Sequence, residues 1–342
     1  MPPTSRIPPL LHPYTQLPPD QGCLTLLTGV LGASTNWLVI RYICGALVKD
    51  EASHGADEDT AVILVSWLRD WDFWKTESRR AGGLDLARLA HQGRFVFVDG
   101  LSGLFLPADV ESIAPAAAPA SPQAASRGPR TITPRGAPQP ARAQVVAPTT
   151  PSAPTQQQQS STLRLNSPTL AHLEETLQRA QAHLDAALPK KTLLILDQPD
   201  VLLAAADPAV APTDLAASLL HLRAGAHSTV LTLSADAPLV AAAAPDVVAP
   251  VSRAAHSPLE AAHAAFLIGQ AHVADLVLSL RLLDTGYAAD VSGVLRITRG
   301  DNGDEVQERS GEDDAKAGKE LLYYVGGDGT VKVFERGAGT SG

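Results

Sequence analysis

Short apolar runs alternate with amphipathic stretches along most of the chain, a pattern typical of strands separated by helices. Strands buried on both faces of a parallel sheet read as near-continuous aliphatic runs, such as AVILVS at Ala61–Ser66. The predicted strands are Cys23–Thr28, Ala61–Ser66, Phe95–Val98, Thr192–Leu196, Thr229–Leu233 and Ala274–Leu280. The predicted helices are Asn36–Val48, Asp72–Arg80, Thr169–Ala187, Thr213–Ala224 and Pro258–Ala271. The pattern therefore predicts an α/β fold with a mostly parallel, twisted sheet flanked by helices.

The last sixty or so residues follow a different pattern. Their strand candidates are Gly293–Thr298, Leu321–Val325 and Thr330–Phe334. Gly326-Gly327-Asp328-Gly329 between the last two is a strong hairpin signal, because glycine and aspartate accept the positive φ angles of tight hairpin turns. The sequence therefore predicts an antiparallel C-terminal edge on the sheet, with the acidic stretch from Asp301 to Glu320 as a solvated loop.

Between about residues 107 and 162 the chain is almost entirely Ala, Pro, Ser, Thr, Gln and Arg. Such a composition has too few large apolar side chains to offset the entropy of ordering, so this segment is predicted to be disordered. It is either a linker between domains or an insertion. Three strands make a poor parallel sheet and six make a good one, which favours an insertion in a single domain over 22–336. The flanking stretches 1–21 and 337–342 are predicted to be disordered tails.

Composition narrows the class of protein. The 342 residues carry 27 Lys and Arg against 36 Asp and Glu, so the formal net charge is 27 − 36 = −9. That charge counts against a chain that coats DNA, although the insertion is locally basic through Arg127, Arg130, Arg135 and Arg142. No apolar run is long enough to cross a membrane, and the proline-rich start has no signal-peptide core. Cys23 and Cys44 suit no metal or redox motif and are predicted to be buried thiols. An intracellular location follows, either the cytoplasm or, in addition, the nucleus.

The turn after the first strand lies where a phosphate-binding loop would be found. Backbone N–H groups and a helix N-terminus can cradle phosphate there. A working GxxxxGK[ST] motif starting at Gly29 needs glycine at Ser34, lysine at Thr35 and a hydroxyl residue at Asn36, and all three differ. One interpretation is a tight turn, with Gly32 inside it, capped by Ser34 or Thr35. The other is weak nucleotide binding at a degenerate loop.

Two strands end in an acid, as the Walker B strand of nucleotide hydrolases does. Leu193–Leu196 precedes Asp197, and Phe95–Val98 precedes Asp99. The pattern is common, so one of the two acids is expected to be structural. Together with the degenerate turn, these strands point to a RecA-like core without its catalytic groups.

Three of the four tryptophans, Trp67, Trp71 and Trp74, are spaced i, i+4, i+7. On a helix they would form one stripe, which would pack either into the core or against a partner. Lys75, Arg79 and Arg80 follow, and they are candidates for phosphate contact or for simple solvation. The histidines show no metal-ligand spacing, and no nucleophile–base arrangement is present.

Several stretches resemble the RecA/KaiC-type ATPases, namely the passage from Gly83 to Asp99, the segment Leu194–Leu203, and Ala274–Leu280 leading to Leu295–Gly300. More specifically, the chain resembles the fungal family of Elongator complex protein 6. The residues that carry this resemblance are Leu24–Thr35, Val65–Arg80, Gly93–Phe105, Ala226–Asp236 and Leu282–Gly300.

This resemblance implies a structural subunit that forms a hetero-hexameric RecA-like ring with the paralogous Elongator subunits four and five, two copies of each. The ring joins the Elongator catalytic core, binds tRNA and supports modification of the wobble uridine. It implies no required cofactor for this chain, with ATP or ADP bound at ring interfaces. Arg299, and less clearly Arg296, match the position from which a basic residue reaches a neighbour's nucleotide. One rival interpretation is a self-sufficient KaiC-like ATPase, which is disfavoured because Thr35 stands where such an enzyme has lysine. The other is a recombinase-like DNA-binding paralogue, which the net charge disfavours.

Overall fold

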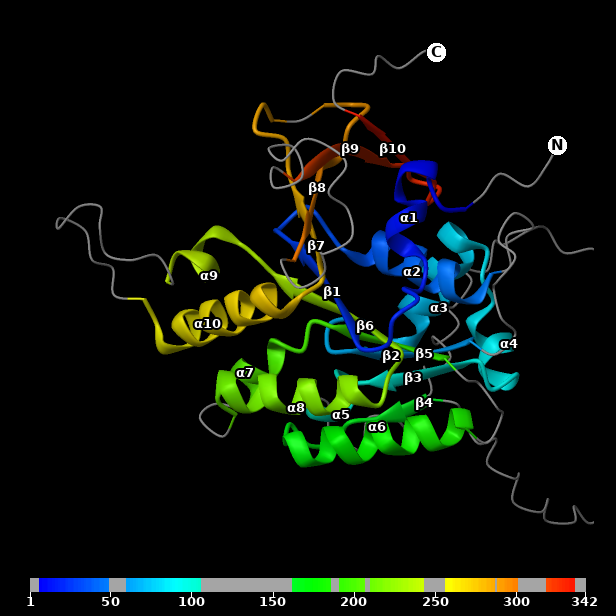
Figure 1. Cartoon of the computed structure of the whole chain (residues 1–342), viewed down its shortest axis with the longest axis vertical. Coiled ribbons are helices and arrows are strands. Elements are labelled where there is room, and N and C mark those ends of the chain that lie inside the picture. The colour runs from blue at the N-terminus through cyan, green and yellow to red at the C-terminus, as the bar shows by residue number, and fades with distance from the viewer. Residues whose placement is uncertain are drawn as a thin grey trace, which may run out of the picture. The chain divides into compact units, whose positions relative to one another are not determined.

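In the computed structural model, the described residues are 6–48, 60–105, 162–185, 191–206, 210–242, 256–286, 288–300 and 318–335. Residues 1–106 and 161–342 belong to one compact unit. Its described residues form a single sheet with helices packed on both faces (Figure 1). Three predicted segments lie outside the described residues. They are the insertion (except for Thr162 at its end), the C-terminal tail, and nearly all of the acidic loop.

The strands match the predicted apolar runs closely. They are β1 Cys23–Gly29, β2 Thr60–Ser66, β3 Phe95–Asp99, β4 Thr162–Arg164, β5 Lys191–Asp197, β6 Ser228–Ser234, β7 Leu276–Arg281, β8 Gly293–Arg299, β9 Lys319–Val325 and β10 Val331–Glu335. Their order in the sheet is β10-β9-β8-β7-β1-β6-β5-β2-β3-β4. The short strand β4 has no counterpart among the predicted strands, because three residues are too few to show a periodic pattern.

Neighbouring strands from β7 to β4 in this order pair in parallel, and β8, β9 and β10 continue the sheet with antiparallel pairing. The prediction of a mostly parallel α/β sheet with an antiparallel C-terminal edge is therefore confirmed. β2 pairs with both β3 and β5, and β1 pairs with both β6 and β7. Strands from before and after the segment 107–162 thus alternate in one sheet, so neither half of the chain closes a sheet alone.

Helices connect the parallel strands. They are η1 Pro9–Leu11, α1 His12–Thr15, α2 Asn36–Leu47, α3 Trp71–Gly82, α4 Leu86–His91, α5 Ser102–Phe105, α6 Leu170–Asp185, α7 Val201–Ala205, α8 Pro212–Ala224, α9 Ala237–Ala241 and α10 Pro258–Val273. Local capping fixes several ends. Ser257 and Glu260 form a capping box at the start of α10, and Asp70 accepts a hydrogen bond from the Phe73 N–H at the start of α3. In the part of the chain that the structure describes, no helix is both long and apolar enough to cross a membrane.

The sheet separates two hydrophobic cores. Helices α2, α3 and α4 pack on one face, and α6, α7, α8 and α10 pack on the other (Figure 1). Alternate residues of each central strand feed the two cores, because successive side chains of a strand point to opposite faces. On β2, Val62 and Leu64 lie in the first core, whereas Ile63 and Val65 lie in the second. Burial on both faces explains the unbroken apolar runs in the sequence.

The N-terminal stretch differs from the prediction of a disordered tail over 1–21. Residues 6–21 are described, and they include η1 and α1. Leu11 is fully buried and Ile7 nearly so, both in the core beneath α2. A Cβ at Gly45 of α2 would overlap the Thr15 carbonyl oxygen, so this glycine allows α1 to approach closely. Apolar burial outweighs the proline-rich composition on which the prediction rested.

The prediction that three tryptophans form one helical stripe is wrong. Helix α3 begins only at Trp71, because Asp70 caps it there. Trp67 follows β2 and lies fully buried in the core on the α6 side of the sheet, whereas Trp74 is fully buried in the core on the α3 side. Trp71 is half-buried and packs its ring 5.6 Å from that of Phe97. Of the two interpretations, core packing is confirmed, but on two opposite faces.

Candidate functional site

The carboxyl ends of parallel strands meet at one edge of a sheet, where α/β proteins place their ligands. In this chain that edge carries the predicted phosphate-loop turn after β1 and the predicted Walker B acid after β5. One strand, β6, lies between β1 and β5. Both features therefore belong to one candidate site, whose chemistry depends on which polar groups remain available there.

The turn Gly29–Asn36 is held closed by its own backbone. The Ala33 N–H donates to the Val30 carbonyl at 2.8 Å, and these two residues form an isolated antiparallel bridge. Gly32 lies within this bridge at a φ of +90°, a conformation that favours glycine. A Cβ at Gly29 would lie 2.7 Å from the Ala33 carbonyl oxygen, so the backbones approach too closely for a larger residue. The geometry of the turn therefore explains why both positions are glycine, without a bound phosphate.

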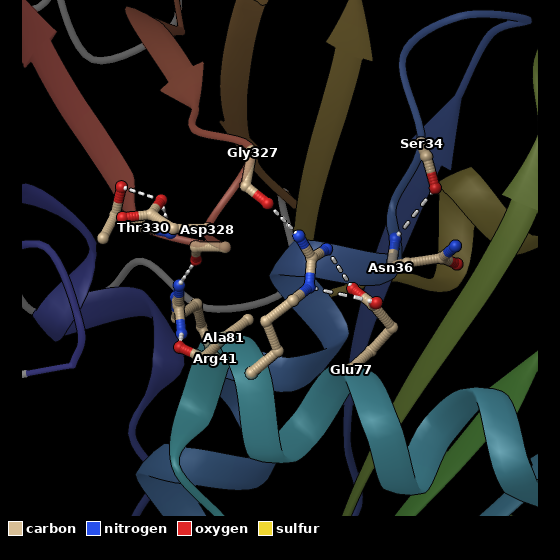
Figure 2. Close-up of polar contacts among 10 residues, drawn as sticks. Ser34, Asn36, Arg41, Glu77, Ala81, Gly327, Asp328 and Thr330 are labelled. Carbon is tan, nitrogen blue, oxygen red and sulfur yellow. Dashed lines mark hydrogen bonds and ion pairs between the residues drawn. The ribbon is translucent and has the colours of Figure 1, made fainter.

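The helix that follows begins with a side-chain cap from within the turn. The Asn36 N–H donates to Ser34 Oγ at 3.2 Å, as Figure 2 shows. Thr35 is buried at the N-cap position of α2, and its side chain makes no capping bond. Ser34 is therefore the capping residue of the two that the sequence proposed. The position at which a phosphate loop carries its lysine is filled by a buried threonine.

A carboxylate from the neighbouring strand occupies the turn. The Leu31 N–H donates to Oδ1 of Asp236 at 2.7 Å, and the Ala235 N–H donates to the Gly29 carbonyl at 2.8 Å. Asp236 thereby takes a backbone donor that a phosphate cradle would direct at its ligand, and its charge repels an anion at short range. The sequence does not single out Asp236. Its position just after β6, the strand beside β1, is the signal that identifies it once the strand order is known.

Asp197, at the end of β5, is enclosed by hydroxyl groups. It is 1% exposed, and it accepts hydrogen bonds from Ser66 Oγ at 2.7 Å and from Thr232 Oγ1 at 2.8 Å. Burial raises the pKa of Asp197, and the two hydroxyl bonds lower it in part. Ser66 ends β2 and Thr232 belongs to β6, so the carboxylate joins three adjacent strands. Both oxygens are engaged within the protein, and an acid in this state is poorly placed to hold a metal ion.

Asp99, the second strand-ending acid, caps a turn. Its Oδ1 accepts from the Leu101 N–H at 2.9 Å and from the Ser102 N–H at 2.8 Å. The expectation that one of the two acids is structural holds for Asp99. The hydroxyl bonds of Asp197 give that residue a structural task as well.

Backbone strain marks the residue after Asp197. Gln198 has a φ of +61°, the single positive value among the described non-glycine residues. A left-handed conformation costs such a residue on the order of 1 kcal/mol or more. Its side chain accepts from Ser234 Oγ at 2.8 Å, and its N–H lies 3.0 Å from Thr232 Oγ1. These bonds to β6 keep Gln198 in the strained conformation.

A buried histidine–carboxylate pair lies beside this turn. His263 Nε2 of α10 is 2.9 Å from Asp200 Oδ2, and both side chains are more than nine-tenths buried. Burial, with a smaller contribution from nearby Asp197, raises the pKa of Asp200 to about 7, while burial lowers the pKa of His263. The two groups therefore share one proton near neutral pH. Sequence reasoning does not find this pair, because sixty-three positions separate its members.

The pair predicts a pH dependence of stability. The folded-state pKa of Asp200, about 7, lies above the value of about 4 for an unfolded aspartate, so the folded state holds a proton that the unfolded state releases. This contribution to stability is present below pH 4 and is lost as the pH rises toward 7. The lowered pKa of His263 acts in the opposite direction below about pH 6.5. We expect the unfolding free energy of the wild type minus that of Asp200→Asn to fall between pH 5 and 7, as measured by urea titration.

The exposed Asp72→Asn variant, which removes a carboxylate away from the buried pair, is the control for this experiment. A constant difference for Asp200→Asn across the same range would contradict the assignment of a shared proton to the buried pair.

The basic residues proposed to contact RNA are paired with acids. Lys75 lies 2.7 Å from Asp72 and Arg79 lies 3.1 Å from Asp85. The Arg80 guanidinium pairs with Glu77 at 2.5 Å and also donates to the carbonyl of Gly327 in the β9–β10 hairpin turn (Figure 2). These exposed pairs contribute little to stability, but they reduce the positive potential available to a phosphate.

Arg296 and Arg299 both lie on β8, and the sheet separates them. Arg299 is opposite Leu276, the first residue of β7, so it lies at the edge away from the turn after β1. Arg296 is opposite Ser279 on one side and Glu320 on the other. The two arginines are three positions apart, and successive side chains of a strand alternate between the faces, so the two side chains point to opposite faces of the sheet. A single neighbouring chain on one face would meet only one of them.

The cysteines and the metal-ligating side chains do not form a reactive site in the described residues. Cys44 is buried as predicted, whereas Cys23 is half-buried, and both are thiols rather than disulfide halves. Burial raises the pKa of the Cys23 thiol, which disfavours the reactive thiolate. Within the described ranges, no three His, Cys, Asp or Glu side chains gather closely enough to hold a metal ion.

In comparisons with known proteins, no protein-family model matches this sequence, and no curated protein matches it either.

Proposed function

We propose that this chain is a non-catalytic structural subunit of a hetero-hexameric, RecA-like ring of the Elongator complex. Its neighbours in the ring are the paralogous subunits four and five, and the ring supports tRNA binding and wobble-uridine modification by the catalytic core. The chain works by docking, needs no cofactor of its own, and resides in the cytoplasm, either alone or in addition to the nucleus. ATP or ADP binds, if anywhere, at the interfaces of the ring.

The observation that carries the non-catalytic part of the proposal is the closed turn after β1. Asp236 accepts the Leu31 N–H at 2.7 Å, and the buried Thr35 stands where a phosphate loop has lysine. A nucleotide would have to displace the carboxylate and would still lack a fixed ammonium group for its β and γ phosphates. Asp197 supports the non-catalytic proposal as well, because both of its carboxylate oxygens accept hydrogen bonds from hydroxyl groups and are poorly placed to hold Mg²⁺.

The RecA-like part of the proposal is supported by how the sheet is arranged. A glycine turn leads from β1 into α2, and an apolar strand ending in Asp197 lies two positions away at the same edge. These are the two elements that a nucleotide-driven motor uses at the carboxyl edge of its sheet. The stretch Leu24–Thr35, which resembles the Elongator family, includes the first of these elements, and the stretch Leu194–Leu203, which resembles RecA/KaiC-type ATPases, includes the second.

The main alternative is a self-sufficient KaiC- or RecA-like ATPase. It shares the fold, and it differs in requiring the turn to open and Asp236 to release the Leu31 N–H. A recombinase-like DNA-binding role is disfavoured by the net charge of −9 and by the acid partners of Lys75, Arg79 and Arg80. Any tRNA contact by these three residues would be strongly salt-dependent.

Co-expression with subunits four and five tests the proposal. The chain should co-purify with both, and native mass spectrometry should give a hexamer with two copies of each subunit. A chain that remains separate from both partners, under conditions in which it is folded by circular dichroism, would overturn the proposal.

Arg299 provides a further prediction within this proposal. Arg299→Gln should lower ATP turnover by the assembled ring by about tenfold or more, because a charge that stabilises the transferring phosphoryl group is lost. The hexamer should still form, since one exposed side chain contributes little to a large interface. Arg179→Gln, at an exposed arginine of α6 with no proposed role at the nucleotide, is the matched control. Unchanged turnover in the Arg299 variant would contradict the assigned role.

A further inference from the structure

Helices α8 and α10 lie side by side on one face of the sheet (Figure 1). An apolar groove of about 360 Å³ runs between them. Small side chains, Ala217 of α8 and Ala265 and Gly269 of α10, line much of it. Two large apolar side chains flank these residues, and they are strongly exposed: Leu220 at 64% and Val273 at 47%. A soluble domain does not usually gather exposed aliphatic residues along a groove unless something covers them.

The outward face of α10 is unusual for a surface helix. From Ala261 to Val273 the helix has no Asp, Glu, Lys or Arg, although several of these residues are exposed. An exposed helix normally carries charged residues on its outward face, whereas the exposed positions here are Ala, Gly and Val apart from His272.

Gly269 of α10 also indicates that another element packs against this face of the helix. It lies within the helix, and a Cβ built on it would meet nothing within 4 Å among the described residues. Mid-helix glycine costs about 1 kcal/mol relative to alanine, and nothing in the described chain requires it. A helix that packs closely over this position would supply the reason, because small residues allow two backbones to approach.

One charged residue lines the groove. Arg223, in the last turn of α8, donates from Nη2 to the Gly22 carbonyl at 3.1 Å. Its Nε is buried and has no hydrogen-bond partner among the described residues. Burial lowers the pKa of Arg223, with Asp275 acting against this shift. The guanidinium places one positive charge at this end of the groove, which favours an acidic side chain on the surface that docks there.

We propose that the α8–α10 groove receives a helix from a neighbouring chain, with a small apolar face and an acidic side chain that meets Arg223. The α8 wall from Pro212 to Arg223 corresponds to about 18 Å of helix, which matches a partner helix of about three turns. Helix-in-groove docking of this kind uses apolar anchors at i, i+3 and i+4 spacing. The inference rests on the proposed function, which supplies the neighbouring chain as a subunit of the same ring.

Cysteine labelling tests the occupant directly. Ala217→Cys places a thiol in the groove, in a Cys23→Ser background, and Ala171→Cys places one on an exposed position of α6 outside it. Native mass spectrometry first establishes whether the ring with subunits four and five has formed. A maleimide should then react with the Ala217→Cys thiol about tenfold more slowly in the ring than in the isolated chain, because interface cores exclude solvent. The Ala171→Cys thiol should react at similar rates in both.

Each other outcome overturns the inference in a distinguishable way. If the ring forms and the Ala217→Cys thiol reacts as fast as before, the groove is not the docking site, while the proposed function stands. If that thiol is already protected in the isolated chain, a second copy or a segment of the same chain covers the groove. If no ring forms with the wild-type chain, the proposed function fails together with this inference.

A charge introduced into the groove gives an independent measurement. Leu220→Glu should leave the melting temperature of the isolated chain nearly unchanged, because the leucine is largely exposed there. It should weaken ring assembly by about tenfold or more, since the carboxylate would be buried in an apolar contact. Leu68→Glu, at 42% exposure and outside the groove, is the matched control. Equal assembly of both variants would contradict the proposal.

Discussion

Replacing Trp74 by alanine is expected to lower the free energy of unfolding by about 3–5 kcal/mol. Trp74 is fully buried between α3 and the sheet, and its ring meets that of Phe73 edge-to-face at a centroid distance of 5.4 Å. Its Nε1 has no hydrogen-bond partner among the described residues, so the loss is one of packing and a cavity. Urea denaturation followed by circular dichroism measures the effect. Leu31→Ala, at a residue 86% exposed, should change stability by no more than about 0.5 kcal/mol.

Trp67 extends this prediction to the other face of the sheet. It is fully buried in the core on the α6 side, away from Trp74. The milder variants Trp67→Phe and Trp74→Phe should therefore have effects that add within about 0.5 kcal/mol, as independent sites do. Strong coupling between them would mean that the two tryptophans share one packing cluster, as a single helical stripe requires, and it would contradict the two-core arrangement.

Replacing Asp197 by alanine is expected to lower the free energy of unfolding by about 2–3 kcal/mol. The substitution leaves the hydroxyls of Ser66 and Thr232 buried without their acceptor, and an unsatisfied buried donor costs about 1–3 kcal/mol. Relief of the burial that raises the pKa of Asp197 offsets part of that cost. The measurement is urea unfolding of the purified chain at pH 7.

The matched control removes the whole network. Ser66→Ala and Thr232→Val added to Asp197→Leu should recover part of the lost stability, because both hydroxyl donors are removed together with their acceptor. Recovery is incomplete, since the N–H groups of Gln198 and Arg69 lose the hydroxyl oxygens that accept from them. In the assembled ring, the isosteric Asp197→Asn should leave ATP turnover within about twofold of the wild type, since removal of a metal-holding acid would cost far more. A collapse of turnover in that variant would mean that Asp197 holds a metal ion, as a catalytic Walker B acid does.

The fold was largely predictable because strands buried on both faces leave an unmistakable signal. The runs at Ala61–Ser66 and Thr192–Leu196 correspond to β2 and β5 within one residue at their ends. The hairpin signal at Gly326–Gly329 likewise marks the turn between β9 and β10. Local patterns of this kind need no knowledge of which strands are neighbours.

The candidate site was less predictable because it depends on neighbours that are distant in the sequence. The role of Asp236 follows only from the position of β6 beside β1, and the Asp200–His263 pair joins elements sixty-three residues apart. The tryptophan spacing misled for a local reason, since the Asp70 cap starts the helix after Trp67. In the N-terminal stretch, two buried side chains, Ile7 and Leu11, decide the structure within an otherwise proline-rich segment.

ATP turnover by the isolated, purified chain tests the central claim most directly. With its turn closed on Asp236 and without a lysine at position 35, the chain alone should release no phosphate above the buffer background at saturating ATP and Mg²⁺. Multiple-turnover ATP hydrolysis by the monomer that is abolished by Asp197→Asn would contradict the account. It would identify the chain as an ATPase in its own right.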